Sequence, residues 1–233
     1  MRLAVLSDIH GNGVGLEAVL DDLARERLDG FVCLGDVSEG GPHPAECHDR
    51  VRALGCPVVK GNTDWWLANY RYEPHLAARG DIGAWAIERL GPERMATIAS
   101  FEPYVELDVG DGARMLCVHG SRDSHVEKIP PDVTDDELDR HAHGAQLLAH
   151  GHTHVQWLRR TRRTTVFNPG RIGGDLDRVL RGMEHDLDGW AEYAVVEPRR
   201  VELRRVRYDL AELRRAILES GLPHAEEAAR RLA

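Results

Sequence analysis

Seven residues that can ligate divalent metal ions occur just past the ends of short apolar segments of the chain. They are Asp8, His10, Asp36, Asn62, His119, His152 and His154. Imidazole nitrogens and carboxylate or amide oxygens suit Zn, Mn, Fe, Ni or Co, and the absence of cysteine from the set disfavours a sulfur-bound structural zinc. Two such ions about 3.5–4 Å apart polarise a phosphoryl group and make hydroxide available near neutral pH. The set therefore predicts two divalent transition metal ions and hydrolytic chemistry.

The segments that come before the first four of these residues are predicted to be strands. Residues 2–6, 31–34 and 57–60 are short apolar runs, and they alternate with helical patterns over residues 14–28 and 44–54. This βαβαβ alternation is typical of parallel strands joined by right-handed crossovers. In such sheets the ligand crevice lies beyond the carboxyl ends of the strands. We therefore expect ligands that are far apart in the sequence to converge in space.

The second half of the chain has a different pattern, because many of its segments alternate in polarity as antiparallel strands do. The predicted strands are 103–109, 113–118, 146–150, 155–160, 164–167, 191–197 and 200–207. Together with the first half, they predict a mixed α/β fold in which two sheets pack together with helices outside. No repeat or linker marks a boundary, so we expect one domain over residues 1–233.

Helical patterns occupy the middle and the end of the chain. Residues 64–100 are predicted to be helical, with breaks near Pro74, Gly80 and Gly91-Pro92. Residues 209–219 and 223–232 are predicted to form terminal helices. We expect these terminal helices (209–232) to pack on the body of the domain, although a contact in a homodimer remains an open alternative for the amphipathic helix 209–219.

The composition excludes several classes of function. The formal charge of −9 argues against general binding to nucleic acid or to anionic membranes, because an acidic chain repels both. The basic run at residues 159–163 is interpreted as charge on an edge strand that prevents aggregation with other sheets. No apolar run approaches the ~20 residues that span a bilayer. With no visible signal peptide and four cysteines that form no CxxC pair, we expect a cytoplasmic protein.

Five short blocks in this order resemble the calcineurin-like metallophosphoesterases, in particular their small bacterial and archaeal phosphodiesterase branch. The blocks are Asp8-Ile9-His10, Gly35-Asp36, Gly61-Asn62-Thr63-Asp64, Val118-His119-Gly120 and Gly151-His152-Thr153-His154, and Asn168-Pro169-Gly170 matches a further one. The resemblance covers residues 1–172 and implies a four-layer α/β/β/α sandwich of two mixed sheets with a dinuclear site at the carboxyl ends of the strands.

The same resemblance implies a role for each ligand. Asp8, His10 and His154 would hold the first metal. Asn62, His119 and His152 would hold the second, and Asp36 would bridge the two ions. Manganese is among the metals expected.

Two departures from the family pattern bear on the substrate. Thr63 stands where many members carry a histidine that protonates the leaving oxygen, and threonine is no acid near neutral pH. Gly40 stands where protein phosphatases of the family carry a phosphate-gripping arginine. Both losses disfavour dianionic monoesters and poor leaving groups. The expected activity is therefore hydrolysis of phosphodiester or phosphoanhydride bonds by a metal-bridging hydroxide, on a small phosphate ester such as a nucleotide.

Besides the ligands, three residues are candidates for a catalytic role together with Asp36 and Asn62. Asp64 belongs to the same block as Asn62. His43 follows Asp36 closely and could face the site. Arg171 comes directly after the Asn168-Pro169-Gly170 block, where it would contact phosphate or form an ordinary surface salt bridge.

Two other functions remain open. One is hydrolysis of dinucleoside polyphosphates, which depends on whether a base-stacking aromatic among Trp65, Trp66 and Tyr70 reaches the pocket. The other is a non-catalytic scaffold, because the retromer subunit with this fold serves as a binding platform. A scaffold is free to lose metal ligands, whereas all seven positions here carry competent ones. His125, outside the motif blocks, is expected to be solvated.

Overall fold

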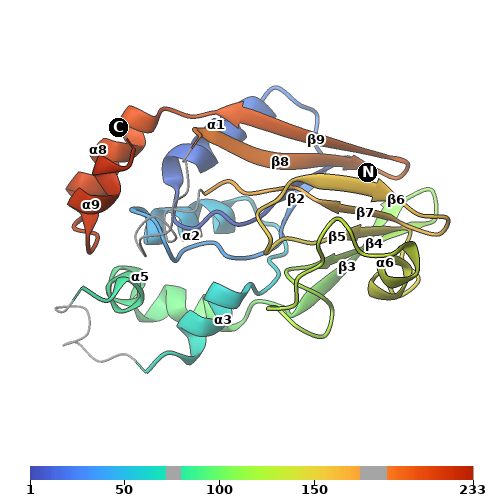
Figure 1. Ribbon diagram of the computed structural model, residues 1–233, viewed down its shortest axis with the longest axis horizontal. Helices are drawn as coiled ribbons and strands as arrows, with labels where there is room; N and C mark the ends of the chain where they lie inside the picture. Colours follow the sequence, from blue (N-terminus) through green and yellow to red (C-terminus); the bar gives the residue numbers. More distant parts are fainter. Residues whose placement is uncertain (72–79, 174–187, 233) are drawn as a thin grey trace.

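Two mixed β-sheets form the centre of the protein (Figure 1). The computed structural model describes residues 1–71, 80–173 and 188–232. The first sheet has the order β2-β1-β8-β9, with β1 Leu3–Leu6, β2 Gly30–Cys33, β8 Trp190–Glu197 and β9 Arg200–Arg207. The second has the order β3-β4-β5-β7-β6, with β3 Tyr104–Gly110, β4 Ala113–Val118, β5 Leu147–Ala149, β6 Trp157–Arg160 and β7 Thr165–Asn168. Each sheet combines parallel and antiparallel pairs.

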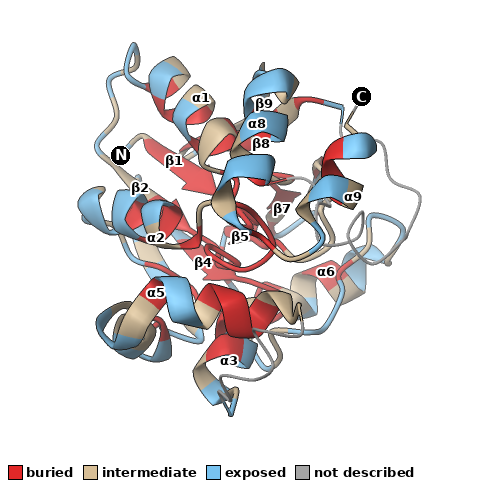
Figure 2. Ribbon diagram, turned by 90° about the vertical axis from the view of Figure 1, so that its left-hand side faces the viewer, coloured by how far each residue is buried: buried red, intermediate tan, exposed pale blue. Residues whose placement is uncertain are grey.

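The alternation of side chains along β1 separates two of the three cores of the protein. Leu3 and Val5 point into the core between the two sheets, where they meet Met115 and Ala149 of the second sheet. Their neighbour Leu6 points the other way, into the core beneath the helices. Both faces of the strand are therefore buried, as is usual for a strand that has a parallel neighbour. Figure 2 shows β1, β4 and β5 as almost entirely buried.

A third core lies on the outer face of the second sheet. Leu116 and Val118 of β4 point away from the first sheet and pack against Leu138 of helix α6 (Asp135–His141). The order is therefore helices, first sheet, second sheet and α6, which gives four layers (Figure 1). The predicted α/β/β/α sandwich is confirmed.

The remaining helices cover the first sheet or extend from its edge. They are α1 Gly13–Leu23, α2 Pro44–Ala53, α3 Asn62–Asn69, α5 Ile82–Ala99, α8 Leu210–Ser220 and α9 Ala225–Arg230. Leu213 and Ile217 of α8 belong to the same core as the helix-facing side of β1. Helix α9 lies beside α8 at the end of the molecule far from α6 (Figure 1). Among the described residues, no helix is long and apolar enough to cross a membrane.

The predicted strand at residues 57–60 is wrong. Val58 and Val59 are buried, as expected, but they make only isolated bridges, to Cys33 and to Glu102. Pro57 has no amide hydrogen to donate, and α3 begins at Asn62, so the segment is too short to form a ladder. Asn62 therefore lies at the start of a helix.

Helix boundaries account for the other differences. The helix predicted to reach residue 28 ends at Leu23. The predicted helical stretch 64–100 contains α3 and α5, and α5 has a kink at Gly91, which has φ 69°. The predicted break at Pro74 lies outside the described residues. The short helix α6 was not predicted, although the reciprocal capping of Thr134 and Glu137 is a sequence signal for it.

Candidate metal centre

The predicted ligands lie on tight loops whose backbone is left-handed. The φ angles are 52° at Asp8, 47° at His10, 53° at Asp36, 66° at His152 and 60° at His154. Residues with a side chain seldom adopt positive φ, and such strain persists only where the surroundings hold it and is concentrated at functional sites. The signal is independent of residue type, and it marks five of the seven predicted ligands.

Backbone hydrogen bonds hold these loops against one another. The amide of His10 donates to the carbonyl of Asp36 at 2.9 Å, and the amide of Asp8 donates to that of Gly35 at 3.1 Å. The amide of Gly151 donates to the carbonyl of His119 at 2.8 Å. The amide of Gly173, after β7 of the second sheet, donates to the carbonyl of Asp8 at 2.8 Å, so the two sheets contribute loops to one site at the carboxyl ends of their parallel strands, where parallel sheets bind ligands.

Asp8, His10 and His154 form the first group of ligand atoms. Nε2 of His154 lies 3.2 Å from Oδ1 of Asp8 and 3.1 Å from Nε2 of His10. Nε2 of His10 lies 3.8 Å from the same carboxylate oxygen. One carboxylate oxygen and two imidazole nitrogens therefore face a common point.

The buried carboxylate of Asp8 shows that this point suits a cation. Its Oδ2 accepts hydrogen bonds from Oγ of Ser7 at 2.5 Å and from the amide of His152 at 3.2 Å. Its Oδ1 is buried, faces His10 and His154, and has no hydrogen-bond partner. Because an uncompensated buried charge is costly, the geometry fits a metal ion held by Oδ1 and the two imidazoles.

Asp36 lies between the first group and the second. Its Oδ1 accepts a hydrogen bond from the amide of Thr63 at 2.9 Å, which fixes the carboxylate. Its Oδ2 lies 3.6 Å from Nε2 of His10 and 3.4 Å from Nε2 of His119. A single oxygen thus faces imidazoles of both groups.

Asn62, His119 and His152 form the second group, together with Asp36. One atom of the Asn62 side-chain amide faces inward, and it lies 2.9 Å from Nε2 of His119 and 2.7 Å from Nδ1 of His152. The same atom lies 3.3 Å from Oδ2 of Asp36. Four potential ligand atoms therefore converge. The structure brings all seven predicted ligands together.

Two of the imidazoles are oriented by backbone carbonyl groups behind them. Nδ1 of His10 lies 3.0 Å from the carbonyl oxygen of Glu39, and Nδ1 of His119 lies 2.9 Å from that of Leu34. A ring that donates from Nδ1 presents the lone pair of Nε2 to the centre when it is neutral. Such an outer partner fixes both the tautomer and the direction of a metal-ligating histidine.

Comparison with known proteins identifies the family. The model of the calcineurin-like phosphoesterase superfamily domain matches residues 1–184 of this chain. The chain belongs to this superfamily. The family resemblance predicted from five short blocks is thus confirmed.

Related proteins match over nearly the full length of the chain. An uncharacterized protein of Methanocaldococcus jannaschii is 26% identical over 232 residues, which are 95% of this chain and 93% of that protein. The crystal structure of a metallophosphoesterase from Sphaerobacter thermophilus has 30% identity and a TM-score of 0.79, covering 100% of this chain and 98% of that one. The crystal structure of a hypothetical protein from Pyrococcus horikoshii has 21% identity and a TM-score of 0.81, covering 99% of this chain and 97% of that one. This similarity shows that the two proteins have the same fold.

Asp64 lies behind the predicted ligands and holds their loops. Its Oδ2 accepts hydrogen bonds from the amides of Asp36 at 2.8 Å and Gly61 at 2.9 Å, and its Oδ1 accepts one from Val37 at 3.3 Å. Burial and the nearby charge of Asp36 raise the pKa of Asp64 to about 6. Both oxygens are engaged with backbone groups, so Asp64 positions Asp36 and the start of α3.

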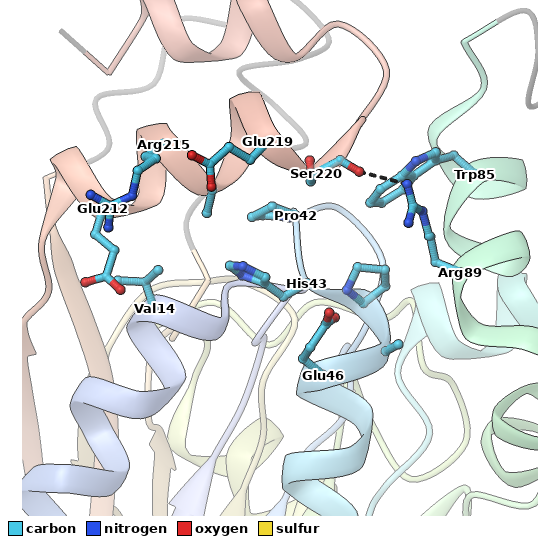
Figure 3. A pocket seen from close by; sticks show the side chains of 13 residues that line it. Val14, Pro42, His43, Glu46, Trp85, Arg89, Glu212, Arg215, Glu219 and Ser220 are labelled. Atoms are coloured by element: carbon cyan, nitrogen blue, oxygen red, sulfur yellow. Dashed lines mark hydrogen bonds between the residues drawn. The ribbon is translucent and has the colours of Figure 1, made fainter.

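The side chain of His43 lies in a different cavity. This cavity, of about 540 Å³, is lined by residues of α2, α5 and α8, among them Glu46, Arg89 and Glu212 (Figure 3). Burial lowers the pKa of His43. His43 is not among the described residues that line the cavity at Asn62 and Thr63.

Arg171 contacts the loop of a predicted ligand. Its Nη1 donates a hydrogen bond to the carbonyl oxygen of His154 at 3.3 Å, and its Nη2 lies 3.8 Å from Oδ1 of Asp188. Both roles considered for Arg171, a phosphate contact and a salt bridge, therefore stay open, because the side chain is close to the candidate site and also forms an ion pair.

A cavity of about 750 Å³ opens beside the second group of ligands. Asn62 and Thr63 line it together with Trp65, Trp66 and His125. His125 was expected to be solvated, yet it is half-buried and its ring lies 5.2 Å from that of Trp65, with 26° between the planes. Nothing in the sequence around His125 marks it, since only packing brings the loop after β4 to the start of α3.

The carboxylates of the centre raise the pKa of two of its histidines and so favour their protonated form. Burial opposes charge on both rings, but at His10 it is outweighed by the nearby carboxylates of Asp8 and Asp36, so the pKa of His10 rises to about 10. Burial is outweighed at His119 by the charge of Asp36, and its pKa rises to about 9. Burial alone would raise the pKa of Asp8 and Asp36, but the neighbouring histidines hold both well below the usual range.

Metal binding is therefore expected to release about two protons at pH 7.5, one each from His10 and His119, because metal ligands must be deprotonated. The raised pKa values mean that the apparent metal affinity should rise with pH until about pH 9–10. Calorimetric titration with Mn²⁺ in two buffers of different ionisation enthalpy measures the number of protons. The variant His119→Ala should release about one fewer. Equal heats in the two buffers would contradict the expectation.

Proposed function

We propose that this protein is a dinuclear metal-dependent hydrolase of phosphodiester or phosphoanhydride bonds. The observation that carries the proposal is the position of Asp36 Oδ2, which faces His10 of one ligand group and His119 of the other. Asp8, His10 and His154 would hold one ion, and Asn62, His119 and His152 the other, with Asp36 shared between them.

Two bound metals supply Lewis-acid polarisation of a phosphoryl group and a lowered pKa of water. The protein supplies the rigid placement of the ligands. Glu39 and Leu34 orient the imidazoles through their carbonyl groups, and Asp64 holds the Asp36 loop. Arg171, which bonds to the His154 loop, is a candidate for a phosphate contact. His43 is the weaker candidate, because it lines another cavity.

The cavity beside Asn62 favours substrates of low negative charge. Of the described residues that line it, none is an arginine or a lysine, and the acidic residues Glu39 and Asp81 belong to its wall. Thr63 also lines it, and its hydroxyl oxygen is buried without a hydrogen-bond partner. A diester carries one charge and a monoester close to two, so two metals alone can neutralise more of the charge that develops on a diester.

We expect bis(p-nitrophenyl) phosphate to be hydrolysed with a kcat/KM at least about tenfold above that of p-nitrophenyl phosphate, a difference of about 1.4 kcal/mol. The variant Thr63→His adds an imidazole acid beside Asn62, so it should raise monoesterase relative to diesterase activity. The measurement is steady-state release of p-nitrophenolate from both substrates by wild type and variant. A tenfold preference of the wild type for the monoester would contradict this assignment.

The scaffold alternative is less well supported by the site. All seven ligands are present, and the outer contacts of His10 and His119 orient lone pairs that a binding platform would not need. We further propose manganese as one candidate metal and the cytoplasm as the location. Three buried cysteines, Cys33, Cys47 and Cys117, are free thiols, which suits a reducing compartment. For a homodimer, the candidate contact that the sequence suggests is α8, where Leu218 is 44% exposed.

A further inference from the structure

Two tryptophans of α3 stand exposed next to a predicted metal ligand. Trp65 is 45% exposed and Trp66 is 38% exposed, and both follow Asn62 within one turn of the helix. Elsewhere in the protein, Trp85 and Trp157 are each only 8% exposed. Indole rings carry large apolar surfaces, so leaving two of them in water at one place is costly and marks a surface that binds something.

Both rings face the cavity that Asn62 and Thr63 also line. The apolar side chains of Ile82 and Val126 also line it. Asn62 is the predicted ligand that lines this cavity, so the cavity adjoins the second group at that residue. A molecule whose phosphate lies at the metal centre would extend an attached group over the tryptophans.

The neighbours of the two indoles hold them in place. The ring of Trp65 is stacked near that of His125, and the ring of Trp66 lies 4.4 Å from that of Tyr70. Gly83 makes room for Trp66, because a Cβ at Gly83 would lie 2.1 Å from the indole. Ring surfaces that are fixed before binding lose little entropy on binding, as a stacking platform requires.

We propose that Trp65, with His125 and Trp66, forms a subsite for the nucleobase of a nucleoside phosphodiester whose phosphate is cleaved at the metal centre. This inference rests on the proposed function and narrows its substrate class. A base is planar and uncharged, so it suits a wall made of indole and imidazole rings. The acidic wall residues Glu39 and Asp81 disfavour a polyphosphate chain in the same cavity, so the subsite favours a nucleoside diester over a dinucleoside polyphosphate.

The kinetic test compares two substrates with the same leaving group. Thymidine 5′-(p-nitrophenyl phosphate) carries a nucleoside where methyl p-nitrophenyl phosphate carries a methyl group. In the wild type, we expect kcat/KM to be at least about tenfold higher for the nucleoside diester than for the methyl diester. This factor is within the range that stacking of one base on an aromatic ring contributes to binding. Trp65→Ala should lower this ratio to about one to three, and Trp65→Phe should restore most of it.

A matched control is available on the first sheet. Trp190 packs against Arg205 and Arg207 and does not line the cavity, so Trp190→Phe should keep the wild-type ratio. Metal content is measured for every variant, because Trp65 follows the ligand Asn62 by three positions. A ratio near one in the wild type, or an unchanged ratio in Trp65→Ala, would overturn the subsite while leaving the diesterase itself in place.

A binding test separates the subsite from the chemistry. Quenching of tryptophan fluorescence by AMP and by ribose 5-phosphate is titrated on the protein as purified, without turnover. We expect AMP to bind at least about tenfold more tightly, and Trp65→Ala to abolish the difference. If the protein binds AMP more tightly than ribose 5-phosphate but hydrolyses neither of the two p-nitrophenyl diesters, the result would contradict the proposed function and support the subsite. Equal affinities for AMP and ribose 5-phosphate would overturn the subsite. The subsite would also be overturned if raising the protein concentration alone protected Trp65 from quenching by acrylamide, because a second copy of the protein would then occupy this surface.

Discussion

Asp36→Asn is expected to lower kcat/KM for bis(p-nitrophenyl) phosphate at least about a thousandfold, well beyond the 10–100-fold typical of an outer-shell partner. The carboxylate has two fixed tasks: Oδ1 accepts from the amide of Thr63, and Oδ2 faces the imidazoles of both groups. An asparagine has only one oxygen. Its NH₂ group would face either the Thr63 amide or the metal centre, and the shared negative charge is lost in both orientations.

The matched control for this substitution is Thr63→Ala. Thr63 contacts Asp36 through its backbone amide, which alanine keeps, so we expect its kcat/KM to fall by less than about tenfold. Metal analysis and the thermal unfolding midpoint of both variants would separate loss of metal from loss of fold. Equal losses of activity in the two variants, or a larger loss in Thr63→Ala, would show that the bridging role is wrongly assigned.

Removal of metal is expected to lower the activity to below about one per cent, because the metals supply both the polarisation of the phosphoryl group and the activated water. Protein purified without chelator should contain close to two equivalents of transition metal. After dialysis against a chelator, activity should return with Mn²⁺ in proportion to occupancy up to two equivalents. Inductively coupled plasma analysis, paired with the rate of p-nitrophenolate release, measures both quantities.

Two variants distinguish the two metal positions. His154→Ala removes a ligand from the first group and His152→Ala removes one from the second, so each should lower the stoichiometry toward one equivalent. Loss of both equivalents in one variant would show that the groups do not act as separate positions. A stoichiometry of zero in the wild type, even after addition of Mn²⁺, Ni²⁺ or Co²⁺, would contradict the dinuclear centre.

The residues that converge at the candidate centre and most of the layers could be predicted from the sequence because both depend on local patterns. Strands such as β1 and β4 are apolar runs that end directly before ligands, and polar residues just past a parallel strand must lie at its carboxyl end. The segment 57–60 shows where this reasoning fails. Its valines are buried as predicted, but burial does not determine whether a segment pairs with its neighbours over enough residues to form a ladder, and this segment makes only isolated bridges.

Only the tertiary structure decided which atoms face one another. The loops of the first sheet and those of the second meet through long-range hydrogen bonds, such as that of His152 to Asp8, and no spacing along the chain encodes them. The role of Asp64 also depends on tertiary contacts. Its carboxylate could have pointed to the candidate centre, but it accepts hydrogen bonds from backbone amides behind the predicted ligands. The stacking of His125 on Trp65 joins the loop after β4 to helix α3. Residue type and strand order therefore determined the chemistry available to this protein. The packing of its two sheets decided which of these side chains face one another and which line the cavity beside them, because such contacts depend on distance in space and not on separation in sequence.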